Sequence, residues 1–133
     1  MSQEKVDTAR RAFAAFVSGG IEALLAFCPE DLVTYPFPEW MEEPVYHGRD
    51  GFRELLSGWT EGFDGFVPEV EDLRDGGGDI VVGLGYNAGR IRGTVTPIRQ
   101  PVSGVLRFSE GLLAEAHYFM TWREALEAAG LEE

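Results

Sequence analysis

The first half of the chain carries apolar residues at helical spacing. Between residues 3 and 17 they recur every three or four positions, which predicts an amphipathic helix ended by Gly19-Gly20. A shorter helix over 21–27 and a short strand over 31–35 follow, each bounded by a proline. A third helix is predicted from about residue 49 to residue 63, because its large apolar residues fall on one stripe.

The second half changes to the two-residue alternation of strands. Strands are predicted over 66–73, 80–87, 94–108 and 112–120, with a glycine-rich hairpin loop after the first of them. In the second strand, glycine recurs on the face opposite the large apolar residues, which lets the sheet bend or another group approach closely. Helices followed by a meander of strands indicate an α+β domain with helices on one face of the sheet.

Two further segments complete the prediction. Thr121-Trp122-Arg123-Glu124 is a capping box, in which the threonine caps a backbone amide and the glutamate reaches back, so a final short helix begins there. Gly130 fits the left-handed residue that ends this helix. Residues 36–48 combine three prolines with several large apolar side chains, which predicts an irregular segment that covers the core or forms a lid.

Composition and charge narrow the class of protein. The 133 residues fit a single domain over 1–133. The net charge of −12 disfavours nucleic acids and anionic membranes as partners. Cys28 is the only cysteine, so no internal disulfide is available, and no apolar run reaches the length of a membrane span. The first residues do not form a signal peptide pattern, so we expect a cytoplasmic protein.

Three stretches together resemble one family. The first includes Leu32-Val33-Thr34-Tyr35-Pro36 and Tyr46-His47-Gly48-Arg49-Asp50-Gly51-Phe52, and the second is the glycine hairpin Asp75-Gly76-Gly77-Gly78-Asp79. The third combines Gly111-Leu112-Leu113 and His117-Tyr118-Phe119 with the segment 124–131. The chain resembles a SnoaL-like domain of the nuclear transport factor 2-like superfamily over nearly its whole length.

The resemblance implies a cone-shaped, curved antiparallel sheet wrapped around N-terminal helices, with a short C-terminal helix. It also implies a pocket between sheet and helices, and homodimers that pair through the outer face of the sheet. The family includes polyketide cyclases, ketosteroid isomerases, epoxide hydrolases and dehydratases, along with binding proteins. The fold therefore predicts where a site lies and leaves its reaction open.

The residues of ketosteroid isomerases do not carry over to this chain. Where those enzymes place an aspartate base before a proline, the matching residue here is Tyr35. Where they place a protonated aspartic acid ahead of an Arg-Phe pair, this chain has Gly104 or Ser103. Relatives often carry an aspartate at the entrance to the final helix, where Met120-Thr121 stand here. These differences count against steroid isomerase chemistry.

His117 is the strongest single candidate for a catalytic group. Alternation along the last strand places Leu113, Glu115, His117 and Phe119 on one face. If that face lines the cavity, His117 could act as a general base near neutral pH, and a Tyr35–water pair is the second candidate for proton transfer. If it is the outer face, His117 and Glu115 are surface or dimer residues.

A pocket lined by aromatic residues is the other expectation. Tyrosine and tryptophan join an apolar ring to a polar group, which suits them to orient a ligand. We expect six residues to line the pocket: Trp40, Tyr46, Trp59, Phe63, Tyr86 and Phe119. No metal and no cofactor is expected, because the two histidines are far apart without acids spaced around them.

Three functions remain open on the sequence. The chain could be a cofactor-independent cyclase, isomerase or hydratase that works by proton transfer. It could instead bind a small apolar or ring-containing molecule without chemistry, as the missing acids suggest. The third possibility is a dimeric interaction module whose cavity is filled by side chains.

Overall fold

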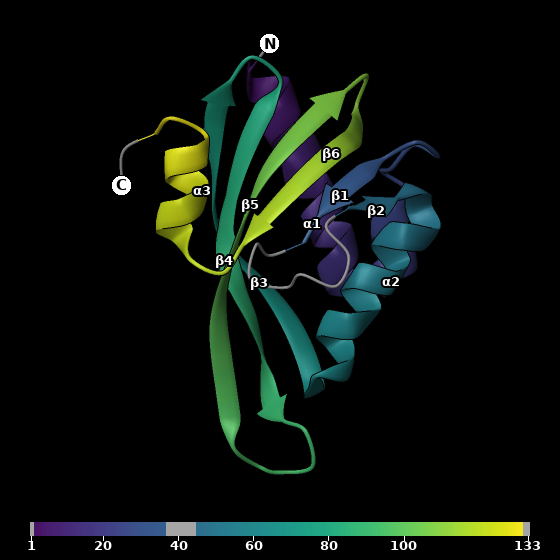
Figure 1. Ribbon diagram of the computed structural model, residues 1–133, viewed down its shortest axis with the longest axis vertical. Coiled ribbons are helices and arrows are strands. Elements are labelled where there is room, and N and C mark those ends of the chain that lie inside the picture. Colours follow the sequence, from purple (N-terminus) through teal and green to yellow (C-terminus); the bar gives the residue numbers. More distant parts are fainter. Residues whose placement is uncertain (1, 37–44, 132–133) are drawn as a thin grey trace.

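The computed structural model describes residues 2–36 and 45–131, which form three helices and six strands (Figure 1). Within this part of the chain, no helix is long and apolar enough to cross a lipid bilayer. In chain order the elements are α1 (Ser2–Leu25), β1 (Val33–Tyr35), β2 (Tyr46–His47), α2 (Gly48–Glu61), β3 (Phe63–Gly77), β4 (Ile80–Ile91), β5 (Pro97–Ser109), β6 (Leu112–Phe119) and α3 (Trp122–Ala128).

The six strands form one curved, unclosed sheet in the order β2-β1-β6-β5-β4-β3. All neighbours are antiparallel except β1 and β6, which run parallel, so the sheet is mixed where the sequence predicted an antiparallel one. Adjacent hairpins produce antiparallel pairs, whereas β1 and β6 meet only after most of the chain has intervened. The α+β class and the curved sheet with a short C-terminal helix are confirmed.

The first helix, α1, joins the two helices that the sequence predicted. It spans Ser2–Leu25, and the break expected at Gly19-Gly20 is present as a kink at Gly20, whose backbone is not helical. Gly20 adopts φ 80° and ψ −165°, a left-handed backbone that favours glycine over residues with a Cβ. The kink lets both halves of α1 contribute buried apolar residues to the same core, including Phe16 and Leu24.

Two hydrophobic cores lie on opposite faces of the sheet. We call the face that contacts α1 and α2 the inner face, and its core includes Phe52, Leu56 and Leu106. On the outer face, α3 packs Ala125 and Leu126 against β4 and a part of β5. The expectation that all helices cover one face is therefore correct for α1 and α2 only (Figure 1). Neighbouring Val81 and Val82 are both fully buried, so β4 is apolar on both faces.

The capping box of the last helix is confirmed, with one difference. The Thr121 hydroxyl oxygen accepts a hydrogen bond from the backbone N–H of Glu124 at 3.3 Å. The Glu124 carboxylate accepts from that hydroxyl at 2.8 Å, instead of from the backbone of the cap residue. At the other end, Gly130 has φ 75° and the Leu131 N–H donates to the Leu126 carbonyl at 2.8 Å. This closes the helix as predicted.

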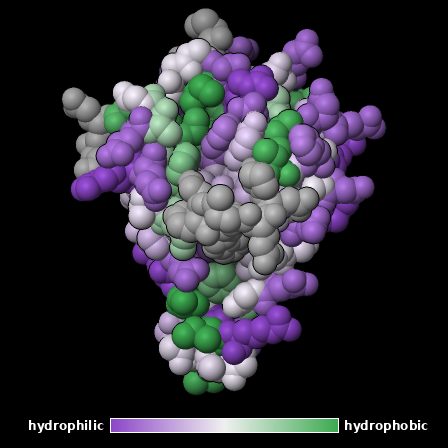
Figure 2. Space-filling model, viewed as in Figure 1, coloured by the Kyte–Doolittle hydropathy of each residue, from purple (hydrophilic) through white to green (hydrophobic). Residues whose placement is uncertain are grey.

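Polar side chains cover most of the visible surface, with small apolar areas between them (Figure 2). One such area lies at the end of the β4–β5 ribbon, where Ile91 and Val95 are 44% and 89% exposed. The ribbon projects beyond the helices (Figure 1), so its far end has no second layer to pack against.

Candidate functional site

A small apolar cavity lies between α1, α2 and the inner face of the sheet. It measures about 60 Å³ and is partly open to solvent. We call it the deep cavity, and its walls include Phe13, Phe16, Leu56, Trp59, Gly83, Asn87, Gly104 and Tyr118. Phe13 and Phe16 come from α1, and Leu56 and Trp59 come from α2.

Missing side chains on the floor of the sheet create this space. Gly83 of β4 pairs with Gly104 of β5, which in turn pairs with Tyr118 of β6. A methyl group added at Gly83 would meet its nearest neighbour, a Leu73 methyl, at 3.6 Å, which is ordinary van der Waals contact. Of the alternating glycines noted in the sequence, Gly83 therefore leaves room for another group above the sheet, whereas Gly85 packs closely against the Glu69 backbone.

Trp59 and Tyr118 form the aromatic wall of the cavity. Both are 6% exposed, and their rings meet edge to face with centroids 4.9 Å apart. Burial raises the pKa of Tyr118 well above its usual value, because a phenolate would lose its hydration there. The Tyr118 hydroxyl therefore stays protonated and neutral at physiological pH. The sequence reasoning missed this residue because Tyr118 was assigned to the face opposite His117.

A second space adjoins the deep cavity. It measures about 270 Å³ and lies between the end of α2 and the β4–β5 ribbon. We call it the rim hollow; its walls are Gly58, Trp59, Gly62, Phe63, Asn87, Ile91, Ile98, Gln100, Pro101 and Met120. Trp59 and Asn87 line both spaces, so the two are neighbours. Together they approach the size of ordinary small-molecule sites.

Charged groups are scarce around the deep cavity. Among the described residues, Glu69 is the one acid in its wall, and its carboxylate pairs with the Arg99 guanidinium at 2.8 Å. Arg99 also bonds to Glu71 at 2.7 Å and lies over the Tyr86 ring. The Glu69 carboxylate is thus already neutralised by a cation and faces solvent in part. No histidine lines the deep cavity in the part of the chain that the structure describes.

The two predicted catalytic residues do lie together, but on the outer face. The rings of Tyr35 and His117 stack with centroids 4.0 Å apart, and His117 Nε2 is 2.8 Å from a Glu115 carboxylate oxygen. His117 is paired across the sheet with Val105, which belongs to the core under α3. Neither Tyr35 nor His117 lines the deep cavity or the rim hollow.

A β-bulge explains why alternation misjudged this strand. Arg107 pairs with Glu115 and Phe108 with Leu113, so Ala114 is an extra residue in β6. The bulge moves Leu113 into the inner core, whereas Glu115 and His117 point outward. The predicted shared face of Leu113 and His117 is therefore wrong, because a single inserted residue exchanges the faces.

The six residues predicted to line the pocket occupy different places. Trp59 lines both spaces and Phe63 lines the rim hollow. Tyr86 borders the deep cavity, but its ring packs against that of Trp122 of α3, with ring centroids 5.4 Å apart. This places the Tyr86 ring on the outer face. Trp40 lies outside the described residues.

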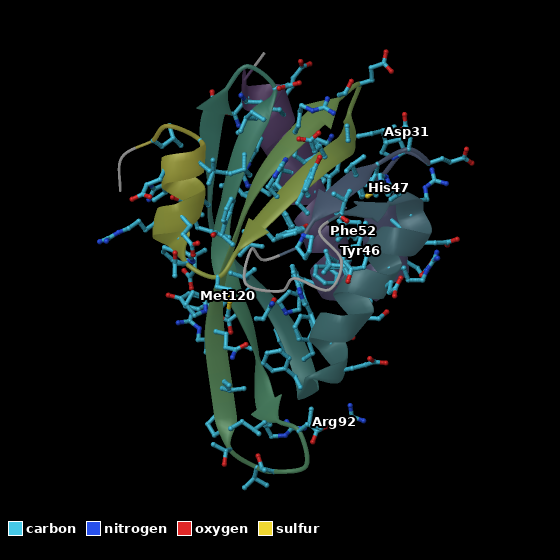
Figure 3. All side chains as sticks on the ribbon, viewed as in Figure 1. Asp31, Tyr46, His47, Phe52, Arg92 and Met120 are labelled. Atoms are coloured by element: carbon cyan, nitrogen blue, oxygen red, sulfur yellow. The ribbon has the colours of Figure 1, made fainter. Side chains whose placement is uncertain are left out.

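The other two are core residues away from both spaces. Tyr46 packs against the inner core beside the first turn of α2, near Phe52 (Figure 3). Phe119 packs against the outer core under α3. Among the described residues, no group of three or more histidine, cysteine or acidic side chains could hold a metal ion.

Comparison with known proteins identifies the family. Residues 9–116 match the SnoaL-like domain. The chain belongs to the SnoaL-like domain family. No curated protein matches the chain at a significant level.

Solved structures of similar proteins agree on the fold of this SnoaL-like protein. An NTF2-like protein from Burkholderia thailandensis is 20% identical with a TM-score of 0.74, over 96% of this chain and 98% of that one. A protein from a Jannaschia species that is named as a SnoaL-like polyketide cyclase is 16% identical with a TM-score of 0.73, over 98% of this chain and 94% of that one. TerC, crystallised with polyporic acid, is 16% identical with a TM-score of 0.71, over 96% and 98%. At these identities the likeness extends to the fold alone.

Proposed function

We propose that this SnoaL-like protein binds a small, uncharged, ring-containing molecule between its sheet and its N-terminal helices, without transforming it. The observation that carries the proposal is the deep cavity, with aromatic walls and a glycine floor, whose one described acid is held by Arg99. A general base must reach the proton that it removes, and no described lining residue offers a free one. Binding therefore accounts for the site better than proton transfer does.

The dimensions of the site support a ring ligand. The deep cavity alone is smaller than most ligand sites, but the adjoining rim hollow adds about 270 Å³. An apolar ring placed over Gly83 and Gly104 would lie against Trp59 and Tyr118, in the offset and edge contacts that aromatic rings favour. Burial of the ring would supply most of the binding free energy.

A thermal-shift screen with a cavity-filling variant tests the proposal. A panel of polycyclic aromatics, steroids, terpenoids and small apolar acids is the starting point. A ligand at a hundred times its dissociation constant stabilises the protein by about 2.7 kcal/mol, or about 5–10 °C at this chain length. Gly83→Ala should at least halve the shift, because its methyl group occupies part of the deep cavity, while leaving the unliganded protein as stable or more stable.

A shift of the same size in wild type and Gly83→Ala would place the ligand elsewhere and contradict the proposal. Gly58→Ala is the matched control: a Cβ there meets nothing within 4 Å, and Gly58 lines the rim hollow but not the deep cavity. It should leave the ligand-induced shift nearly unchanged.

Proton-transfer catalysis is the alternative, with His117 or a Tyr35–water pair as its acid–base group. The hydrogen bond between His117 and Glu115 favours it, since a carboxylate can hold an imidazole in one orientation. Incubating each ligand found in the screen with the protein and analysing the mixture by mass spectrometry distinguishes the two. Recovery of unchanged ligand supports binding, whereas a product that His117→Ala no longer forms would establish catalysis.

A homodimer through the outer face of the sheet is our proposal for the assembly. The outer surface of β1 and β6 carries Tyr35 and His117 in a stacked pair that is only partly buried in the single chain. We expect light scattering to give twice the chain mass at micromolar concentration, and Tyr35→Glu to shift it toward one chain mass by burying a charge. A monomeric wild type would contradict the proposal.

A further inference from the structure

Asn87 is the polar residue at the junction of the two spaces. It lines both the deep cavity and the rim hollow, and it is only 7% exposed. Among the described residues, Trp59 is the one other residue that lines both spaces. An elongated ligand that spans the two spaces must therefore pass the side chains of Trp59 and Asn87. A carboxamide at this point is in place to meet whatever polar group the ligand carries there.

The direction of the Asn87 side chain follows from the strand. β4 pairs with β5 in one continuous register, so Gly83, Gly85 and Asn87 share a face. A Cβ at Gly83 would point toward Phe13 and Leu106, which are inner-face residues. Asn87 therefore points inward, about 13 Å along the strand from the glycine floor at Gly83. This span exceeds the length of three fused rings, so the ring system of a smaller ligand that meets Asn87 lies at the end of the glycine floor nearer the junction.

Asn87 is one of the few buried polar residues among those described, at 7% exposure, and it lines both spaces. A ligand with a polar group at this point could bond to its carboxamide, whereas an apolar group there would leave the amide without a hydrogen bond, which is unfavourable. The amide can donate through Nδ2 and accept through Oδ1, so it matches both carbonyl and hydroxyl groups.

Charge argues against an ionised ligand at the same point. Arg99 pairs with Glu69 and Glu71 on the outer face, beside Tyr86, and no described lysine or arginine lines the rim hollow next to Asn87. The chain as a whole carries a net charge of −12, which repels anions. A neutral hydrogen-bonding group is therefore the best match for Asn87.

We propose that Asn87 selects uncharged ring compounds that carry a hydroxyl or carbonyl group at the end nearer the rim hollow. The inference rests on the proposed binding function and adds the chemical class of the ligand and the residue that recognises it. The ring system lies over the glycine floor, and its polar substituent exchanges a hydrogen bond with the carboxamide at the junction.

Two probes of nearly the same shape test the proposal. 2-Naphthol carries a hydroxyl group where 2-methylnaphthalene carries a methyl group, and both are uncharged at neutral pH. Titration calorimetry gives the ratio of their dissociation constants for the wild type, Asn87→Leu and Gln3→Leu. Gln3 of α1 is exposed, its amide donates to the Asp7 carboxylate at 2.9 Å and it lines neither space, so it is the matched control for loss of a carboxamide.

We expect Asn87→Leu to shift the affinity ratio at least tenfold in favour of 2-methylnaphthalene, and Gln3→Leu to change it less than twofold. An unchanged ratio in Asn87→Leu would overturn the inference while leaving the binding function intact. Failure of both probes to bind the wild type at millimolar concentration would overturn the inference together with ring binding itself. Asn87→Ala, a smaller change, gives the same readout if the leucine variant does not fold.

Discussion

Replacing Phe52 by alanine is expected to lower the free energy of unfolding by about 3–5 kcal/mol. Phe52 of α2 is fully buried, and its ring stacks on that of Tyr118 with centroids 6.3 Å apart. Its removal leaves a void between helix and sheet that the neighbouring side chains fill only in part. Urea denaturation, followed by circular dichroism, measures the change.

Glu54→Ala is the matched control on the same helix. Glu54 is exposed, so its truncation should change the free energy of unfolding by less than about 0.5 kcal/mol. If the two variants lost similar stability, Phe52 would not be a core residue and the contact between α2 and the sheet would be wrong.

Gly85→Ala is expected to cost about 3 kcal/mol, the upper part of the range for overpacking. A Cβ at Gly85 would lie 2.0 Å from the backbone carbonyl oxygen of Glu69 on β3. Backbone cannot rotate away as a side chain can, so β3 and β4 must separate near the irregularity between Val70 and Asp72. Thermal and urea unfolding should both report the loss.

Gly83→Ala, two residues away on the same strand, should have the opposite sign. Its Cβ makes only ordinary contacts, and alanine loses less backbone entropy than glycine on folding, so a gain of about 0.5–1 kcal/mol is expected. Equal losses at Gly83 and Gly85 would show that the glycines of β4 serve only the bending of the strand. The cavity would then have no special relation to Gly83.

Most of the helices and strands could be predicted from local patterns in the sequence. Apolar spacing located α1 and α2, alternation located β4 and β6, and the capping box located the start of α3 at Trp122. These signals depend on neighbours within a few residues, which the sequence displays directly. Glycine alternation in β4 also indicated a place where a group could approach the sheet, and the deep cavity lies there.

Features that depend on contacts between segments far apart in the chain could not be predicted from the sequence. The parallel pairing of β1 with β6 and the packing of α3 on the outer face depend on which strands meet. The bulge at Ala114 moved Leu113 to the face opposite His117, which alternation could not foresee. His117 lies on the outer face, one of the two orientations left open, and Tyr118 on the inner face was overlooked. The sequence did not indicate that Asn87 belongs to the site, because a polar residue in a strand of alternating pattern usually lies on the face exposed to solvent.

A fold shared by a family does not determine the chemistry of its members, which depends on individual side chains. The sequence predicts that the acids of the ketosteroid isomerase pattern are replaced in this chain, and the described wall of the deep cavity has a neutral tyrosine and a carboxamide. The same scaffold can therefore hold a ligand in one member and transform it in another.

The tryptophan side chains offer the most direct test of the central claim, that the ligand binds on the inner face. Trp59 lines the deep cavity, whereas the Trp122 indole donates to the Gly85 carbonyl at 3.0 Å from the outer face. In a ¹⁵N-edited spectrum each indole N–H gives a separate signal, assigned with one tryptophan-to-phenylalanine variant for each. Titration with 2-naphthol should shift the Trp59 signal and leave that of Trp122 in place. A shift of Trp122 with Trp59 unmoved would contradict the account.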